Sequence, residues 1–159
     1  ESEKGKGATF STLFPVSVAK KVEESTMPVQ EFLGNKERVL VVDDVEEMRE
    51  ITAMMLKKLN YTFSTFSSGE AAISYLKAHK AEMVLLDMIM DPGMDGLETY
   101  QAIKKIVPDQ KVIIFSGYSE TDRVQKAKKM GVLAYLKKPF TIKKLGEVLQ
   151  KYLAEPKSD

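Results

Sequence analysis

Short apolar runs alternate with segments of helical spacing from residue 38 onward. In three of the runs nearly every position is apolar, which is typical of parallel strands covered on both faces. Each run is short, and none reaches the length of a membrane span. The five predicted strands are residues 38–42, 61–66, 83–86, 111–115 and 132–136.

The segments between the runs have the periodicity of amphipathic helices. One apolar stripe consists of Met48, Ile51, Met55, Leu56 and Leu59. Another consists of Ile142, Leu145, Leu149, Tyr152 and Leu153. Strands that alternate with helices favour parallel pairing with right-handed connections. The pattern therefore predicts a doubly wound α/β domain around a five-stranded parallel sheet.

The composition narrows the class of protein. With 159 residues, 43% of them hydrophobic, the chain has room for one domain plus an appendage. The 24 basic and 23 acidic residues nearly balance, so we expect neither a nucleic-acid partner nor contact with a membrane surface. Cysteine is absent and no secretory signal pattern opens the sequence, which fits a cytoplasmic location.

Polar residues follow several predicted strands at the edge where such sheets bind ligands, just beyond the carboxyl ends of the strands. Asp43 and Asp44 follow the first strand, and Asp87 follows the third. Ser116 follows the fourth strand, and Lys138 comes soon after the fifth. The fold would therefore collect three carboxylates, a hydroxyl and an ammonium at one rim.

Electrostatics gives this rim a chemical meaning. Two carboxylates about 5 Å apart repel by roughly 3 kcal/mol at an effective dielectric constant near 20, so three of them require a cation. Oxygen ligands in a partly hydrated site suit Mg²⁺, with Mn²⁺ as the alternative ion. Lys138 and Ser116 would complete a clamp for a tetrahedral dianion, leaving Asp87 as the nucleophile that forms an aspartyl phosphate.

Five short stretches carry these residues: VVDD, LLDMIM, PGMDG, IIFSG and YLKKPF. In order and spacing they resemble the receiver domain of two-component response regulators, over residues 36–154. The resemblance implies a flavodoxin-like fold with strand order 2-1-3-4-5. It also implies that Asp87 is the phosphoacceptor and that Asp43 and Asp44 hold Mg²⁺. Ser116 and Lys138 would contact the phosphoryl group, and the domain would catalyse its own phosphorylation and dephosphorylation.

Further roles follow from the same resemblance. The backbone carbonyl of Ile89 maps to the family's third metal ligand, and the Lys138–Pro139 bond maps to its usual cis peptide. Tyr135 falls at the aromatic switch position, where it would respond to Ser116 and repack the face made by the fourth helix, fifth strand and fifth helix. Ile89 and Tyr118 flank the path of the hydrolytic water, so we expect slow self-dephosphorylation.

The loop after the third predicted strand departs from the family pattern by one residue. Asp91 is inserted between Met90 and Pro92. Because Asp91 lies beyond Ile89, we expect the carbonyl ligand to survive. The loop should bulge, and the Asp91 side chain should face solvent.

The first residues carry a second resemblance. The stretch EKGKGATFSTLFPVS is similar to the last strand of a sensor histidine kinase's ATP-binding domain. The resemblance implies a strand remnant at 1–17, so that the chain would be the C-terminal receiver of a hybrid histidine kinase. Residues 18–35 are polar, which predicts a linker, and residues 155–159 should form a C-terminal tail. The alternative is that the N-terminal segment is an ordinary flexible tail.

The implied phosphodonor is a phosphohistidine on a histidine kinase domain, in the same chain or another, or on a histidine phosphotransfer protein. His79 is the only histidine in the sequence, and we expect it at the surface. The parent kinase, though not this segment, could be membrane-anchored.

Other interpretations attach to the same residues. A degenerate or stand-alone receiver would act as an interaction module without phosphorylation. Asp44 followed by Glu47 fits a helix capping box, a purely structural role. An EF-hand loop is excluded because Pro92 stands where glycine is needed, and a haloacid-dehalogenase-type phosphatase is excluded because its D-x-D motif is lacking. A basic stripe on the predicted fourth helix should be a solvated face: Arg123, Lys126, Lys128 and Lys129.

Overall fold

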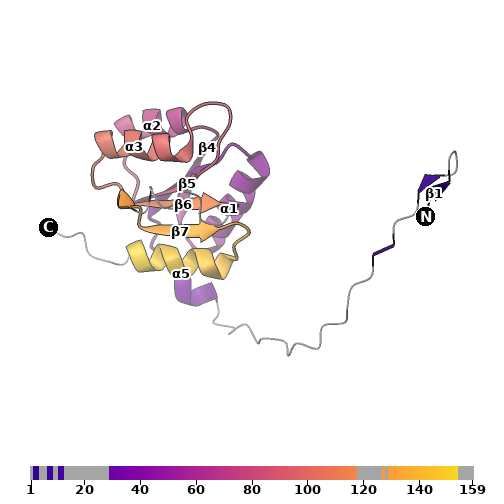
Figure 1. Cartoon of the computed structure of the whole chain (residues 1–159). Helices are drawn as coiled ribbons and strands as arrows, with labels where there is room; N and C mark the ends of the chain where they lie inside the picture. The colour runs from indigo at the N-terminus through magenta and orange to yellow at the C-terminus, as the bar shows by residue number, and fades with distance from the viewer. Residues whose placement is uncertain are drawn as a thin grey trace.

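The computed structural model describes residues 2–3, 7–8, 11–12, 29–117, 127 and 129–153. A parallel sheet with strand order β4-β3-β5-β6-β7 forms the centre of the domain (Figure 1). Its strands are β3 (Arg38–Val42), β4 (Thr62–Phe66), β5 (Met83–Asp87), β6 (Val112–Ser116) and β7 (Ala134–Lys137). Counted within the sheet, this is the predicted order 2-1-3-4-5, so the predicted fold class is confirmed.

Helices cover both faces of the sheet. On one face, Leu56 of α1 (Glu46–Lys58) and Leu149 of α5 (Ile142–Leu153) pack into one core cluster. On the other face, α2 (Gly69–Ala78) and α3 (Gly96–Ile106) pack into a second cluster. The predicted fourth helix falls largely on residues outside the described ranges.

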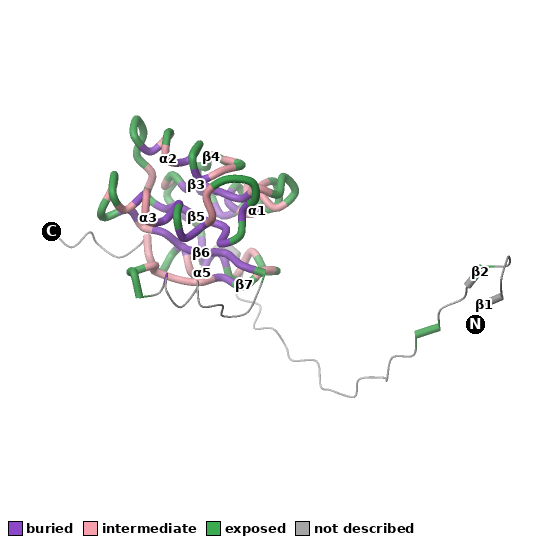
Figure 2. The backbone as a smooth tube through the Cα atoms, turned by 45° about the horizontal axis from the view of Figure 1, so that its top comes forward, coloured by how far each residue is buried: buried purple, intermediate pink, exposed green. Residues whose placement is uncertain are grey.

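The burial of each strand follows its place in the sheet. The central strands β5 and β6 are buried at every position, and β3 at every position after Arg38 (Figure 2). The edge strand β4 is largely exposed, and its Phe63 is 38% exposed. The nearly continuous apolar runs therefore mark the strands that lie between helices on both faces.

The apolar stripe predicted for α1 is partly wrong. Ile51 is 42% exposed, whereas its neighbour Thr52 is 1% exposed. The buried face follows Thr52, Leu56 and Leu59, a spacing of four and then three residues. Ile51 is turned about 100° from that line. Periodicity alone favoured the larger apolar side chain, whereas the buried face is set by Leu56 and by Leu59 at the C-cap.

A short 3₁₀ helix, η1 (Val29–Phe32), packs on the domain immediately before β3. Phe32 is 8% exposed, and a Cβ at Gly146 of α5 would lie 2.6 Å from the Cβ of Phe32, so the two backbones approach closely. The side-chain amide of Gln150 donates to the Glu31 carbonyl at 2.9 Å. The predicted linker, 18–35, therefore overlaps a segment that is part of the domain's packing.

The N-terminal predictions fall mostly outside the described residues. Ser2–Glu3 (β1) pairs antiparallel with Gly7–Ala8 (β2). The strand remnant, the earlier part of the linker and the C-terminal tail stay predictions. Among the helices of the described part of the chain, none is long and apolar enough to span a membrane.

We expect Phe32→Ala to lower the free energy of unfolding by about 3 kcal/mol, because it opens a cavity between η1 and α5. Urea denaturation measures this change. Leu33→Ala is the matched control, because Leu33 is 45% exposed and its truncation should cost less than about 1 kcal/mol. If Phe32→Ala also lowered the free energy of unfolding by less than about 1 kcal/mol, η1 would not belong to the folded unit.

Candidate metal centre at the carboxyl ends of the strands

Three carboxylates meet where β3 and β5 end. Asp43 and Asp44 follow β3 directly, and Asp87 is the last residue of β5. One carboxylate oxygen from each lies within 4.8 Å of the other two. Asp43 is 1% and Asp87 6% exposed, whereas Asp44 is half-buried. The parallel pairing of β3 with β5 forces this meeting, because Val42 and Leu86 are register partners.

Lys138 supplies a cation to the cluster from the segment after β7. Its Nζ lies 2.6 Å from an Asp43 oxygen and 3.1 Å from an Asp87 oxygen. Its backbone N–H donates to the Ser116 carbonyl at 2.8 Å, which ties this segment to the end of β6. The Lys138–Pro139 bond is cis, at the predicted position.

The cluster is short of positive charge. Burial raises the pKa of the Asp87 carboxyl above its ordinary value, although the nearby Lys138 ammonium opposes the shift. One ammonium among three carboxylates leaves the four side chains with excess negative charge. Ligand oxygens around an octahedral Mg²⁺ lie about 3–4 Å from one another. The all-oxygen donor set and its spacing therefore fit a hard divalent cation after small side-chain adjustments.

Arg49 of α1 fixes the backbone that carries two of the acids. Its Nη1 donates to the carbonyl of Asp43 at 2.7 Å and to that of Asp44 at 2.9 Å. An Oδ1 of Asp43 accepts the Val45 N–H at 3.0 Å. Arg49 was not among the residues predicted for the site, and its only signal in the sequence is a cation on the helix that follows the two acids.

The capping-box interpretation of Asp44 is wrong. The N-cap of α1 is Val45, and this residue makes no side-chain cap hydrogen bond. Because the helix begins at Glu46, Asp44 lies one residue too early to cap it. Its Oδ2 instead accepts the backbone N–H of Asp91 at 3.2 Å.

The predicted switch residues lie next to each other. Ser116 ends β6 and is 2% exposed. The Tyr135 hydroxyl donates to the Ser116 carbonyl at 3.4 Å. The half-buried Tyr135 packs against a small cluster that contains Met88, Ile114 and Ala127.

Buried and exposed side chains alternate at the start of the loop after β5. The Ile89 side chain is 46% exposed between the buried Met88 and Met90, and Asp91 is exposed as expected. At the far end, the Gly96 N–H donates to the Met88 carbonyl at 3.0 Å. A Cβ at Gly96 would lie 2.2 Å from the Asp87 carbonyl oxygen, so only glycine fits there.

The other candidate residues lie outside the cluster. His79 is exposed at the end of α2, as expected, and its ring stacks on Tyr75 with centroids 4.2 Å apart. Lys129 is the one described member of the basic stripe, and it is exposed. Tyr118 lies outside the described residues.

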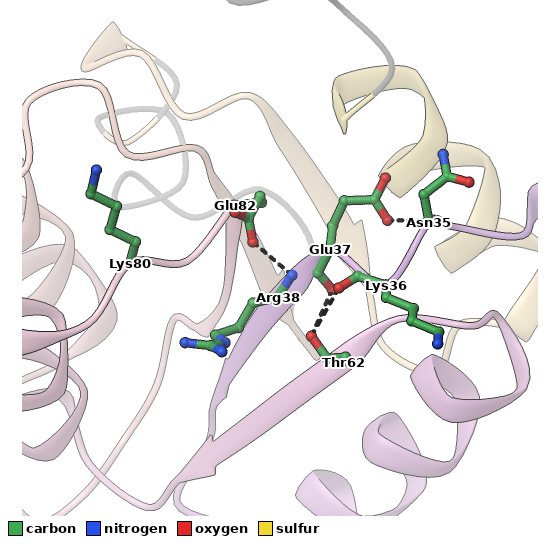
Figure 3. Close-up of a pocket in the computed structure, with 7 residues that line it drawn as sticks. All are labelled: Asn35, Lys36, Glu37, Arg38, Thr62, Lys80 and Glu82. Carbon is green, nitrogen blue, oxygen red and sulfur yellow. Dashed lines mark hydrogen bonds between the residues drawn. The ribbon is translucent and has the colours of Figure 1, made fainter.

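A polar pocket at the amino ends of β3 and β4 is lined by Arg38, Thr62 and Glu82 among other residues (Figure 3). Its side chains bond the backbone: Glu82 accepts the Arg38 N–H at 2.7 Å, and the Thr62 hydroxyl donates to the Lys36 carbonyl at 3.1 Å. These contacts give the pocket a structural role at the opposite end of β3 from the carboxylates.

Comparison with known proteins places the chain in a family. Residues 39–150 match the family described as response regulator receiver domain. The sporulation initiation phosphotransferase F of Bacillus subtilis is 34% identical over 117 residues, which cover 74% of this chain and 94% of that protein. The sensor kinase CckA of Brucella abortus is 29% identical over 96% of this chain but only 17% of its own length.

A solved structure of a response regulator supports the same family assignment. Response regulator protein TrrA of Thermotoga maritima, determined in complex with Mg²⁺-BeF, superposes with a TM-score of 0.66 and 31% identity. The match covers 73% of this chain and 98% of that one. The family match, the Bacillus subtilis relative and the Thermotoga structure all cover the same region of the sequence. The chain belongs to the response regulator receiver domain family of two-component signal transduction.

Proposed function

We propose that this domain accepts a phosphoryl group on Asp87 from a phosphohistidine and passes the change to a partner-binding face. The observation that carries the proposal is the contact of the Lys138 ammonium with Asp43 and Asp87, beside a third acid. A degenerate receiver that only binds partners is the second candidate. The retention of the three acids, the lysine and the serine argues against it.

In the proposed reaction, an oxygen of Asp87 attacks phosphorus in line with the leaving nitrogen. The new O–P bond forms as the N–P bond breaks, and the imidazole leaves with the bonding electron pair. Asp87 must be ionised to attack. Lys138 favours that form and would remain to neutralise the phosphoryl oxygens, joined by the Ser116 hydroxyl.

Asp43, Asp44 and Asp87, with the Ile89 carbonyl, would hold the ion. Bound Mg²⁺, or Mn²⁺ in its place, would supply the positive charge that the cluster lacks. The Mg²⁺-BeF complex of the Thermotoga relative supports this assignment. Arg49 would keep the backbone of both N-terminal acids in place during turnover, because it holds their carbonyls.

Coupling to the rest of the domain would run through Ser116 and Tyr135. Once phosphoryl oxygens draw the Ser116 hydroxyl toward Asp87, the half-buried Tyr135 ring can turn into the space next to β6. The ring already packs beside Ala127 and Ile114, so its movement would repack the surface formed by β7, α5 and the segment between β6 and β7.

The donor would belong to another domain, because His79 lies at the end of α2, before β5 begins, whereas Asp87 is the last residue of β5. We infer that the chain is a receiver segment of a hybrid histidine kinase. That kinase would be located in the cytoplasm, or anchored in the membrane with this segment on the cytoplasmic side. The match to a sensor kinase over 96% of this chain, beyond the receiver itself, supports this origin. A kinase domain or a histidine phosphotransfer protein would then deliver the phosphoryl group.

Asp87→Asn should abolish phosphorylation, because the amide is not a nucleophile. Incubation with acetyl phosphate and Mg²⁺, followed by intact-protein mass spectrometry, measures the mass gained. Asp91→Asn is the matched control and should gain one phosphoryl group as the natural sequence does, because Asp91 contributes its backbone N–H and its side chain is exposed. No mass gain in the natural sequence would favour the degenerate receiver.

Lys138→Met should slow phosphorylation from acetyl phosphate about a hundredfold, because a positioned cation is lost where negative charge develops. Stopped reactions analysed over time give the rate. Lys137→Met is the control, since Lys137 is exposed one residue earlier. If both variants react at the same rate, the Lys138 contacts have no part in the transfer.

Tyr135→Ala should confine the response to phosphorylation to the neighbourhood of Asp87. Amide hydrogen exchange with and without Mg²⁺ and beryllofluoride should change in α5 of the natural sequence but not in that of the variant. Tyr135→Phe keeps the ring and should respond like the natural sequence. A full α5 response in Tyr135→Ala would show that the signal takes another route.

A further inference from the structure

The loop that carries the inserted Asp91 is tied down by two carboxylates from outside it. Its two ends are fixed by packing: Met88 and Met90 are buried at one end, and Gly96 lies against the backbone of Asp87 at the other. Between these anchors, the Asp91 N–H donates to Asp44 at 3.2 Å, and the Met94 N–H donates to Glu70 at 3.0 Å.

Glu70 reaches this loop from the first turn of α2 and is not part of the acidic cluster. Hydrogen bonds from its own backbone N–H and from that of Met94 lower the pKa of the Glu70 carboxyl, so the group is a carboxylate at neutral pH. Gly93 has a φ of +114°, and a Cβ there would approach a Glu70 oxygen to 3.1 Å. The loop backbone therefore lies close to the Glu70 carboxylate at two successive residues, Gly93 and Met94.

The other tie ends on a member of the proposed metal site. The Asp91 N–H donates to an oxygen of Asp44, and the same carboxylate contributes an oxygen to the shared site. A hydrogen bond to a ligating carboxylate fixes its orientation, and the loss of such partners typically weakens metal affinity about 10- to 100-fold. The position of the loop therefore affects the orientation of the Asp44 carboxylate toward a bound ion.

We propose that Glu70 is a positioning residue for the metal site: by holding the Met94 N–H, it keeps the enlarged loop where the Asp91 N–H can orient Asp44. The inference rests on the proposed function in that Asp44 must be a metal ligand. It assigns to the inserted residue a task that its exposed side chain does not perform. Its backbone amide, together with Glu70 of α2, links the loop to the ligand.

Three variants separate this link from a simple effect of charge. Glu70→Ala removes the acceptor and the charge, whereas Glu70→Gln keeps an acceptor oxygen and removes only the charge. Glu47→Ala removes another exposed acid from the first turn of a helix, α1, on the other face of the sheet. Urea denaturation of each variant verifies that the comparison is made on folded protein.

Isothermal titration with Mg²⁺ alone measures the metal affinity of each folded variant. We expect Glu70→Ala to bind Mg²⁺ about tenfold more weakly than the natural sequence, and Glu70→Gln and Glu47→Ala to bind it within about twofold. Equal affinity of Glu70→Ala and the natural sequence would overturn the proposal. An equal loss in Glu70→Gln would also overturn it, because the effect would then be one of charge.

Amide hydrogen exchange in metal-free protein gives a readout that does not depend on the ion. Glu70→Ala should accelerate exchange at both Met94 and Asp91, whereas Glu70→Gln should leave both protected. Acceleration at Met94 alone would show that Glu70 does not hold the Asp91 contact, which would overturn the link. Failure of the natural sequence to bind Mg²⁺ would instead overturn the proposed function, and the exchange data would still decide whether the loop is linked.

Discussion

The crowding of buried carboxylates around one ammonium is the constraint on which the rest of the site depends. Asp43 and Asp87 are nearly inaccessible, and β3 and β5 pair side by side, so the fold cannot move them apart. Removing charge from water is costly unless the charge is paired. Lys138 meets both acids, yet it comes from the far edge of the sheet. The site therefore exists only when β3, β5, β6 and the segment after β7 are assembled.

The sequence predicted the parts of this arrangement that follow from strand direction. Apolar runs identified the strands, and parallel strands place their carboxyl ends on one edge, so the order of residues along the chain was enough to assign Asp43, Asp87, Ser116 and Lys138 to one rim. Helix periodicity was less certain. In α1 it included Ile51, because one stripe of apolar residues can be drawn through either of two adjacent positions when Thr52 is also compatible with burial.

Contacts from side chains to the backbone could not be predicted in the same way. Arg49 holds two carbonyls and Glu70 holds one amide, and neither contact has a characteristic spacing between residue types. The packing of Phe32 on Gly146 was missed for a related reason. The segment before β3 is polar overall, so composition indicated a linker, whereas one aromatic residue and one glycine on a distant helix determine where it lies.

The Ser116 carbonyl limits how a phosphoryl group could be sensed. It accepts hydrogen bonds from the Lys138 N–H and from the Tyr135 hydroxyl, so the backbone at the end of β6 is held by two neighbours on the β7 side. A displacement of this backbone would break both contacts, whereas a rotation of the Ser116 side chain would break neither. Movement of the Ser116 hydroxyl alone, as in the proposed mechanism, would therefore leave both backbone contacts in place. In the proposed mechanism the Tyr135 ring, rather than its hydroxyl, would carry the response out of the site, because the ring packs in a separate cluster with Ile114 and Ala127.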